Sequence, residues 1–161
     1  MIIGKFGFWA RRIVGAATHY IAVATDNSPY VVVFEWSGSG FGTKFANPAT
    51  LPAGAAIDVS FSPGGGSIAV GHTTTPFVAA YPWSGSGFGT KFANPGISVG
   101  SNGRPVAFSP SGASLAVGCL SSPRIVAYPW SDSTGFGTKF TNPATLPAST
   151  GNGVAFSPSG A

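Results

Sequence analysis

The pentapeptide Phe-Gly-Thr-Lys-Phe, at residues 41–45, returns at residues 88–92 and again at residues 136–140, in steps of 47 and 48 residues. A second motif, Phe-Ser-Pro, keeps the same two steps at residues 61–63, 108–110 and 156–158. Two independent motifs with one period indicate a repeat protein, in which each repeat is one unit of supersecondary structure.

Within one repeat, apolar and polar residues alternate and are bounded by Gly, Pro and Ser, which is typical of short strands. In the third repeat this pattern predicts four strands, at residues 106–108, 114–118, 124–130 and 136–140. Helix signals are missing, because Gly or Pro recurs every few residues. The sequence therefore predicts an all-β fold. Four short strands in a period of 40 to 50 residues are typical of a β-propeller blade.

Residues 106–118, Val-Ala-Phe-Ser-Pro-Ser-Gly-Ala-Ser-Leu-Ala-Val-Gly, followed by Tyr-Pro-Trp at 128–130, resemble a blade of the WD-repeat family. The resemblance implies a β-propeller that acts mainly as a platform for interactions. Two features depart from that family. The Gly-His pair occurs once, at Gly71-His72, and lies inside its repeat. The signature Trp-Asp pair is Trp-Ser in every repeat, at Trp36, Trp83 and Trp130.

The period divides the 161 residues into a single partial propeller of roughly 3.4 blades of about 47 residues, fewer than the about four needed to close a ring. The expected units are an atypical first repeat (1–45), a second (46–92), a third (93–140) and the start of a fourth (141–161). The first repeat is expected to begin with an unusual strand over 7–14. Two interpretations follow. The favoured one takes the chain as the N-terminal piece of a longer propeller, and the other has several copies completing one ring.

Charged residues make up 7% of the chain, and the net charge of +4 comes from eight cations scattered along the sequence. A nucleic-acid partner is not expected, since phosphate binding needs cations clustered on one face. No apolar run reaches the 18 residues of a membrane span. A signal peptide is not recognised, because Arg11 and Arg12 follow the apolar residues at the N-terminus. The compartment stays unknown.

The residue types that could act in catalysis or metal binding do not recur at equivalent positions of the repeats. His72 has Thr25 and Cys119 at the equivalent positions, so no shared set of metal ligands exists. Cys119 is expected to be an inert loop residue, and no nearby His would activate it. The lysines of the pentapeptide are expected to face water on the outermost strands. We therefore expect no catalytic residue, no cofactor and no metal. The four acids, likewise unpaired, are Asp26, Glu35, Asp58 and Asp132.

The loops between the second and third strands differ among otherwise similar repeats, which favours a binding surface on one face of the propeller. The sequence thus predicts a non-enzymatic binding or scaffold module with a protein or glycan partner. One alternative is a glycan-binding adhesion propeller, lectin-like or virion-associated. A second is a fragment of a propeller enzyme whose catalytic residues lie outside this chain. The residues expected on the loop face are Asp26, Asn27, Ser28, His72, Thr73, Thr74, Thr75, Leu120, Ser121 and Ser122.

Overall fold

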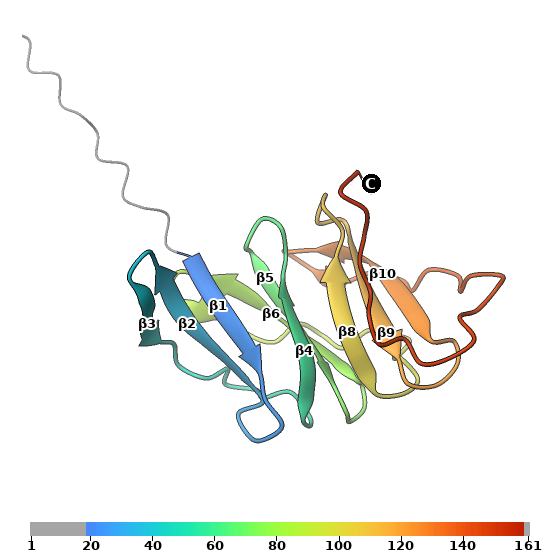
Figure 1. Ribbon diagram of the computed structural model, residues 1–161, viewed down its shortest axis with the longest axis horizontal. Helices are drawn as coiled ribbons and strands as arrows, with labels where there is room; N and C mark the ends of the chain where they lie inside the picture. Colours follow the sequence, from blue (N-terminus) through green and yellow to red (C-terminus); the bar gives the residue numbers. More distant parts are fainter. Residues whose placement is uncertain (1–18, 160–161) are drawn as a thin grey trace, which may run out of the picture.

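The computed structural model describes residues 19–159, which form an open row of three antiparallel sheets without a helix (Figure 1). The prediction of an all-β chain is confirmed, and the strand expected over 7–14 lies outside the described residues. Within each sheet the strands follow sequence order. Sheet 1 contains β1 (His19–Ala24), β2 (Val31–Ser37) and β3 (Gly40–Lys44). Sheet 2 contains β4 (Ala56–Phe61), β5 (Ser67–His72), β6 (Val78–Ser84) and β7 (Gly87–Phe88). Sheet 3 contains β8 (Gly103–Phe108), β9 (Ser114–Cys119), β10 (Ile125–Ser131) and β11 (Gly135–Phe136).

The outermost strand of sheet 3 is shorter than the sequence predicts. The strand expected over 136–140 ends at Phe136, and only the bonds from Gly137 N to Pro129 O (2.8 Å) and from Phe140 N to Ala127 O (2.9 Å) continue the pairing. Proline has no N–H to donate to the outer strand, so the ladder is one-sided there. In sheet 1 the equivalent residue is Glu35, and β3 extends to Lys44.

A tryptophan surrounded by aromatic rings joins sheet 1 to sheet 2. Trp83 lies edge-on to Tyr20 and Phe45 of the first repeat, with ring centroids 5.3 and 5.0 Å apart. It meets Phe61 and Phe88 of its own sheet at 5.8 and 5.1 Å. Edge-to-face contacts of this kind stabilise a core beyond the area that they bury. Trp83 is only 5% exposed as a result.

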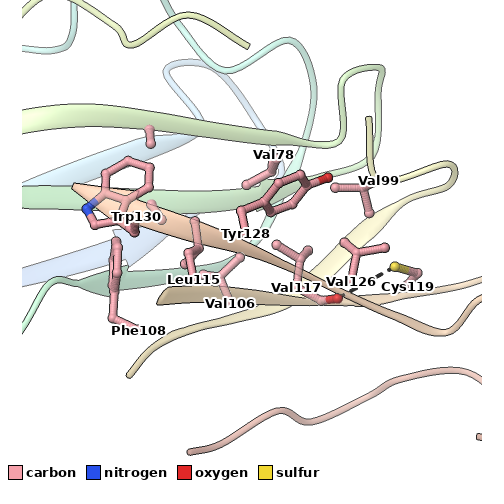
Figure 2. Packing of buried hydrophobic residues seen from close by; sticks show 12 residues of the cluster. Val78, Val99, Val106, Phe108, Leu115, Val117, Cys119, Val126, Tyr128 and Trp130 are labelled. Atoms are coloured by element: carbon pink, nitrogen blue, oxygen red, sulfur yellow. Dashed lines mark hydrogen bonds between the residues drawn. The ribbon is translucent and has the colours of Figure 1, made fainter. Parts of the chain in front are cut away.

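The same cage is built again between sheet 2 and sheet 3. Trp130 contacts Phe92 from the end of the second repeat at 5.3 Å, and it contacts Phe108 and Phe136 of sheet 3 at 5.3 and 5.1 Å. Figure 2 shows Phe108 and Trp130 at one end of the buried cluster between these sheets and Cys119 at the other. The repeat of the sequence is therefore a repeat of one packing unit.

The lysines of the pentapeptide hold the linkers between sheets. Each ammonium donates to the side-chain oxygen of the asparagine three residues later and to the carbonyl of the residue that follows the lysine. Lys44 is exposed as expected, whereas Lys91 and Lys139 are half-buried. The lysine–asparagine pairs are Lys44 with Asn47 at 2.7 Å, Lys91 with Asn94, and Lys139 with Asn142 at 2.6 Å.

A longer turn in the third repeat adds a polar tie between sheets 2 and 3. The carboxylate of Asp132 accepts from Trp130 Nε1 at 2.9 Å and from Ser62 Oγ of sheet 2 at 3.0 Å. In sheet 2 the equivalent residue is Gly85, and the buried Nε1 of Trp83 has no hydrogen-bond partner among the described residues. The two aromatic cages thus differ in whether the indole N–H is satisfied.

Glycines on the second strands let neighbouring sheets approach closely. A Cβ atom added to Gly71 would lie 2.1 Å from the carbonyl oxygen of Arg104, and one added to Gly118 would lie 2.6 Å from that of Gly151. Both distances are far below van der Waals contact, and the obstacle is backbone. These glycines therefore set the spacing between one sheet and the inner strand of the next.

Replacing Gly71 with alanine should destabilise the protein by about 1–3 kcal/mol, because the added methyl group forces the backbone of β8 away from sheet 2. Urea unfolding followed by tryptophan fluorescence measures this change. Gly96→Ala is the matched control, since an added Cβ atom there meets nothing within 4 Å. Equal stability of the two variants would contradict the role of Gly71.

Asp132→Asn should lower stability at neutral pH by an amount that shrinks as the solution is acidified. Partial burial raises the pKa of Asp132, but the hydrogen bonds from Trp130 and Ser62 outweigh it and hold the pKa below its ordinary value. The carboxylate therefore stabilises the fold above its unfolded-state pKa, and this stabilisation is lost as the pH falls through the lowered value. Thermal unfolding of both proteins from pH 7 down to pH 2 would show the two curves converging.

Candidate functional site

The first strands of sheets 2 and 3 lie side by side and form an inner row. β4 and β8 run next to one another in Figure 1, with β1 of sheet 1 beside β4, and the segment 150–156 continues the row beside β8. One carboxylate joins two members of this row, since Asp58 Oδ2 on β4 accepts from the backbone N of Val106 on β8 at 2.8 Å. Asp58 is therefore committed to holding the row together.

Arg104 stands on the inner row at the position that Ile57 occupies one repeat earlier. Its Nη1 donates to Asn152 Oδ1 at 3.2 Å, and Asn152 is the equivalent residue one repeat later. The Nε of Arg104 is buried and has no hydrogen-bond partner among residues 19–159. Arg104 as a whole is partly exposed, so the guanidinium N–H groups that Asn152 does not engage are open to an anionic group.

Sequence reasoning missed Arg104 and Asn152, because it searched for residues shared by the repeats. The signal that could have found them is the opposite one: a charged residue that appears at a position where the preceding repeat has an apolar residue. Ile57 and Arg104 are such a pair.

A groove of about 750 Å³ opens at the end of the row, next to Ile57. The predicted loop residues Asp26, Asn27 and Ser28 line it, together with Ala56 at the start of β4. All three loop residues are exposed. The groove thus presents a carboxylate, an amide and a hydroxyl beside an apolar wall.

The other predicted loop residues lie at the same end of the molecule and partly support the linkers. Thr73 N donates to Ala55 O at 3.0 Å, and Leu120 N donates to Asn102 O at 3.3 Å. Ser121 N donates to Ser101 Oγ at 2.8 Å. The exposed residues of these two loops are Thr74, Thr75, Leu120, Ser121 and Ser122.

His72 does not share that exposure. Its side chain is 0% exposed at the end of β5, and neither ring nitrogen has a hydrogen-bond partner among the described residues. Burial, assisted by the positive charge of Lys91, lowers the pKa of His72 from 6.5 to about 4. The imidazole is therefore neutral at physiological pH and is closed to a partner in this arrangement.

Cys119 is also buried, at the end of β9 rather than in a loop. Burial raises the pKa of its thiol to about 11, although the charge of Lys139 opposes the shift, so the thiolate nucleophile is scarce at neutral pH. Within residues 19–159, no three His, Cys, Asp or Glu side chains come together as a metal site would require. Nor does this part of the chain contain a helix long and apolar enough to cross a membrane.

No family model and no curated protein matches the chain. Among solved structures, it is similar to a candidate 6-phosphogluconolactonase from Bacteroides fragilis, with a TM-score of 0.59 and 19% sequence identity over 75% of this chain. A candidate 6-phosphogluconolactonase from Bacteroides uniformis gives a TM-score of 0.50 and 18% identity over 69% of this chain. The chain covers 34% and 35% of those two proteins, about a third of their length. At these identities the likeness is one of fold.

These structures correct two predictions. The interpretation of the chain as a non-enzymatic binding or scaffold module is contradicted, and so is the prediction that it is no enzyme, because both similar structures are described as candidate enzymes. The repeated residues serve packing, so the repeat pattern that decided the fold carried no information about enzymatic activity. The resemblance to WD-repeat proteins stays a prediction.

Lowering the pH from about 6.5 to about 4 should destabilise the protein in a way that depends on His72. The unfolded chain takes up a proton in this window and the buried imidazole does not, so unfolding is favoured as the pH falls. In His72→Cys, which copies the residue of the third repeat, this part of the pH dependence should disappear. Urea unfolding at several pH values under reducing conditions measures it. Parallel pH curves for the two proteins would show that His72 titrates normally.

Proposed function

We propose that the three sheets are consecutive four-stranded blades of a β-propeller, and that this propeller hydrolyses a phosphorylated sugar lactone. In this proposal Arg104 and the neighbouring groove supply binding groups, and water is activated elsewhere in the closed ring. The fold likeness to two candidate 6-phosphogluconolactonases supports it. The observation that carries the assignment to this chain is the partly exposed guanidinium of Arg104 on the inner row, which Asn152 engages on one side only.

Lactone hydrolysis sets clear requirements on such a site. Water adds to the lactone carbonyl carbon, the ring C–O bond breaks, and the ring oxygen leaves as a hydroxyl after receiving a proton. The water needs a base, and the oxyanion that forms needs hydrogen-bond donors. Asp58 is a poor candidate for the base, because the Val106 N–H already occupies its carboxylate.

The inner row suits the phosphate end of the substrate. Arginine is favoured for phosphate because its planar guanidinium can donate two parallel hydrogen bonds. Asn152 holds one side of the Arg104 guanidinium and leaves the buried Nε unused. Arg104 is partly exposed and donates only through Nη1 within residues 19–159, so its outer N–H groups remain available to a phosphate oxygen.

The neighbouring groove suits the sugar end. Asp26, Asn27 and Ser28 provide acceptors and donors for sugar hydroxyls, and Ile57 provides an apolar wall. Recognition of a neutral polyol needs this mixture of polar groups on a partly apolar surface.

The test is acid release from 6-phosphogluconolactone compared with spontaneous hydrolysis in buffer, with gluconolactone as the substrate that lacks the phosphate. Arg104→Gln should raise KM for the phosphorylated lactone by roughly ten- to a hundredfold, the size expected for one charge-assisted hydrogen bond. The KM for gluconolactone should change little.

Arg124→Gln is the matched control, because the Arg124 side chain donates to the carbonyl of Leu120 in its own loop. It should leave both KM values unchanged. Hydrolysis no faster than in buffer, by protein whose folding is confirmed by circular dichroism, would refute the proposed activity. An equal loss on both lactones in Arg104→Gln would refute the phosphate assignment alone.

A further inference from the structure

We propose that two copies of this chain close one ring head to tail, with residues 150–156 of one copy forming the inner strand of sheet 1 in the other. This inference goes beyond the proposed function and does not depend on it. It names the second copy as the partner of two faces that residues 19–159 leave uncovered. The front face is formed by Val23, Trp36 and Phe41, and the back face by Ile125, Ala127 and Phe140.

Sheet 1 has an open strand edge in the described part of the chain. β4 pairs with β5 in sheet 2 and β8 pairs with β9 in sheet 3, whereas β1 has only β2 as a neighbour within sheet 1. An unpaired inner edge is a template for a strand from another chain. Because β1 is the equivalent of β5 and β9, its missing neighbour should be an equivalent of β4 and β8.

Residues 150–156 have the sequence and the place of such a strand. Val-Ala-Phe at 154–156 repeats the Val-Ala-Phe of β8. Gly151 N donates to Cys119 O at 3.0 Å and Thr150 Oγ1 donates to Leu120 O at 3.2 Å, so the segment is held against sheet 3. Within residues 19–159 it pairs with no second strand of its own. It is thus positioned as an inner strand without a sheet.

The aromatic cage of sheet 1 lacks two rings. Each complete cage takes one phenylalanine from the end of the preceding repeat and one from the inner strand, in addition to one from its own outer strand. Trp36 contacts Phe41 of its own outer strand at 5.1 Å and is 38% exposed, against 5% and 6% for Trp83 and Trp130.

The two missing rings have equivalents at the other end of the chain. Phe140 is the third member of the series Phe45, Phe92 and Phe140, and it is 47% exposed. Phe156 is likewise the equivalent of the inner-strand phenylalanines. One copy therefore carries the two rings that Trp36 of another copy needs.

The aliphatic residues of the two faces match in the same way. Val23 is 39% exposed, whereas its equivalent Val70 is fully buried against Val31 and Val33 of sheet 1. The equivalents of Val31 and Val33 on the back face are Ile125 and Ala127, which line a shallow hollow with Phe140. The back face of one copy thus repeats the surface that buries Val70.

The contact is heterologous, because a front face meets a back face. Such contacts form rings when the rotation closes. Two copies would contribute six sheets, and sheet 1 of each copy would be completed by a strand of the other. The row of inner strands, including Arg104 and Asn152, would then surround one central channel.

Size-exclusion chromatography with light scattering tests the proposal on the whole chain. The expected mass is twice the 16.1 kDa of one chain. A folded monomer at concentrations up to ~100 µM, where an ordinary specific interface would be filled, would overturn the proposal. That result would mean that another segment or a longer chain covers these faces.

Complementary variants separate this contact from non-specific association. Val23→Asp disables the front face and Phe140→Asp disables the back face, so each variant alone should run as a monomer. Mixed together they should form a 1:1 dimer. The intact back face of the Val23→Asp copy meets the intact front face of the Phe140→Asp copy, and the other contact carries both substitutions. Ile57→Asp, at an equally exposed apolar residue on β4 of the middle sheet, should leave the dimer intact. Dimers that persist in both single variants would overturn the proposal.

A cross-link tests the strand exchange itself. Val106 pairs with Val117 across β8 and β9, so the repeat predicts that Val154 of one copy lies opposite Val23 of the other. Opposed residues in antiparallel strands are within disulfide range. A copy with Val23→Cys mixed with a copy with Val154→Cys should therefore give a covalent 1:1 dimer on mild oxidation. The pair Val23→Cys with Ile57→Cys is the control, and equal yields in both mixtures would refute the exchange.

Discussion

The edge-to-face cage around the tryptophan at the end of each third strand is the constraint on which the rest of the structure depends. Trp83 and Trp130 each gather rings from two sheets, so neither cage exists until two repeats have met. A single sheet of this size would expose one apolar face and would be marginally stable at best. The stability of the arrangement therefore lies between the sheets, and the close approach at Gly71 and Gly118 is the geometric condition for it.

Much of this architecture could be predicted from the sequence because the repeat encodes packing. The alternation of apolar and polar residues predicted the strands of the third repeat, and the spacing of the pentapeptide and of the Phe-Ser-Pro motif predicted that the same unit recurs. Prediction failed where a local chemical detail decided the outcome. Pro129 removes one N–H from the ladder and shortens the outer strand. His72 and its equivalent Cys119 are the last residues of the buried second strands β5 and β9, and both are buried there rather than exposed in a loop.

The candidate site was harder to predict for the opposite reason. Binding and catalysis need residues that differ among repeats, and a search for the common pattern passes over them. Arg104 replaces the isoleucine of the preceding repeat, and its partner Asn152 comes from the repeat after it. The pair becomes visible only when three strands that are distant in the sequence are placed side by side. The loop residues Asp26, Asn27 and Ser28 were predicted as a surface, but their relation to the inner row required the structure.

The longer turn that carries Asp132 has a consequence for how the chain finds its native arrangement. Nearly identical repeats can exchange partners during folding, and such misassembly is a characteristic failure of repeat proteins. Asp132 bridges Trp130 and Ser62, a pairing that sheets 1 and 2 cannot copy because Gly85 has no side chain to offer. One carboxylate thus distinguishes the second junction from the first. This contact favours the native pairing of sheets 2 and 3 over pairings between the wrong repeats.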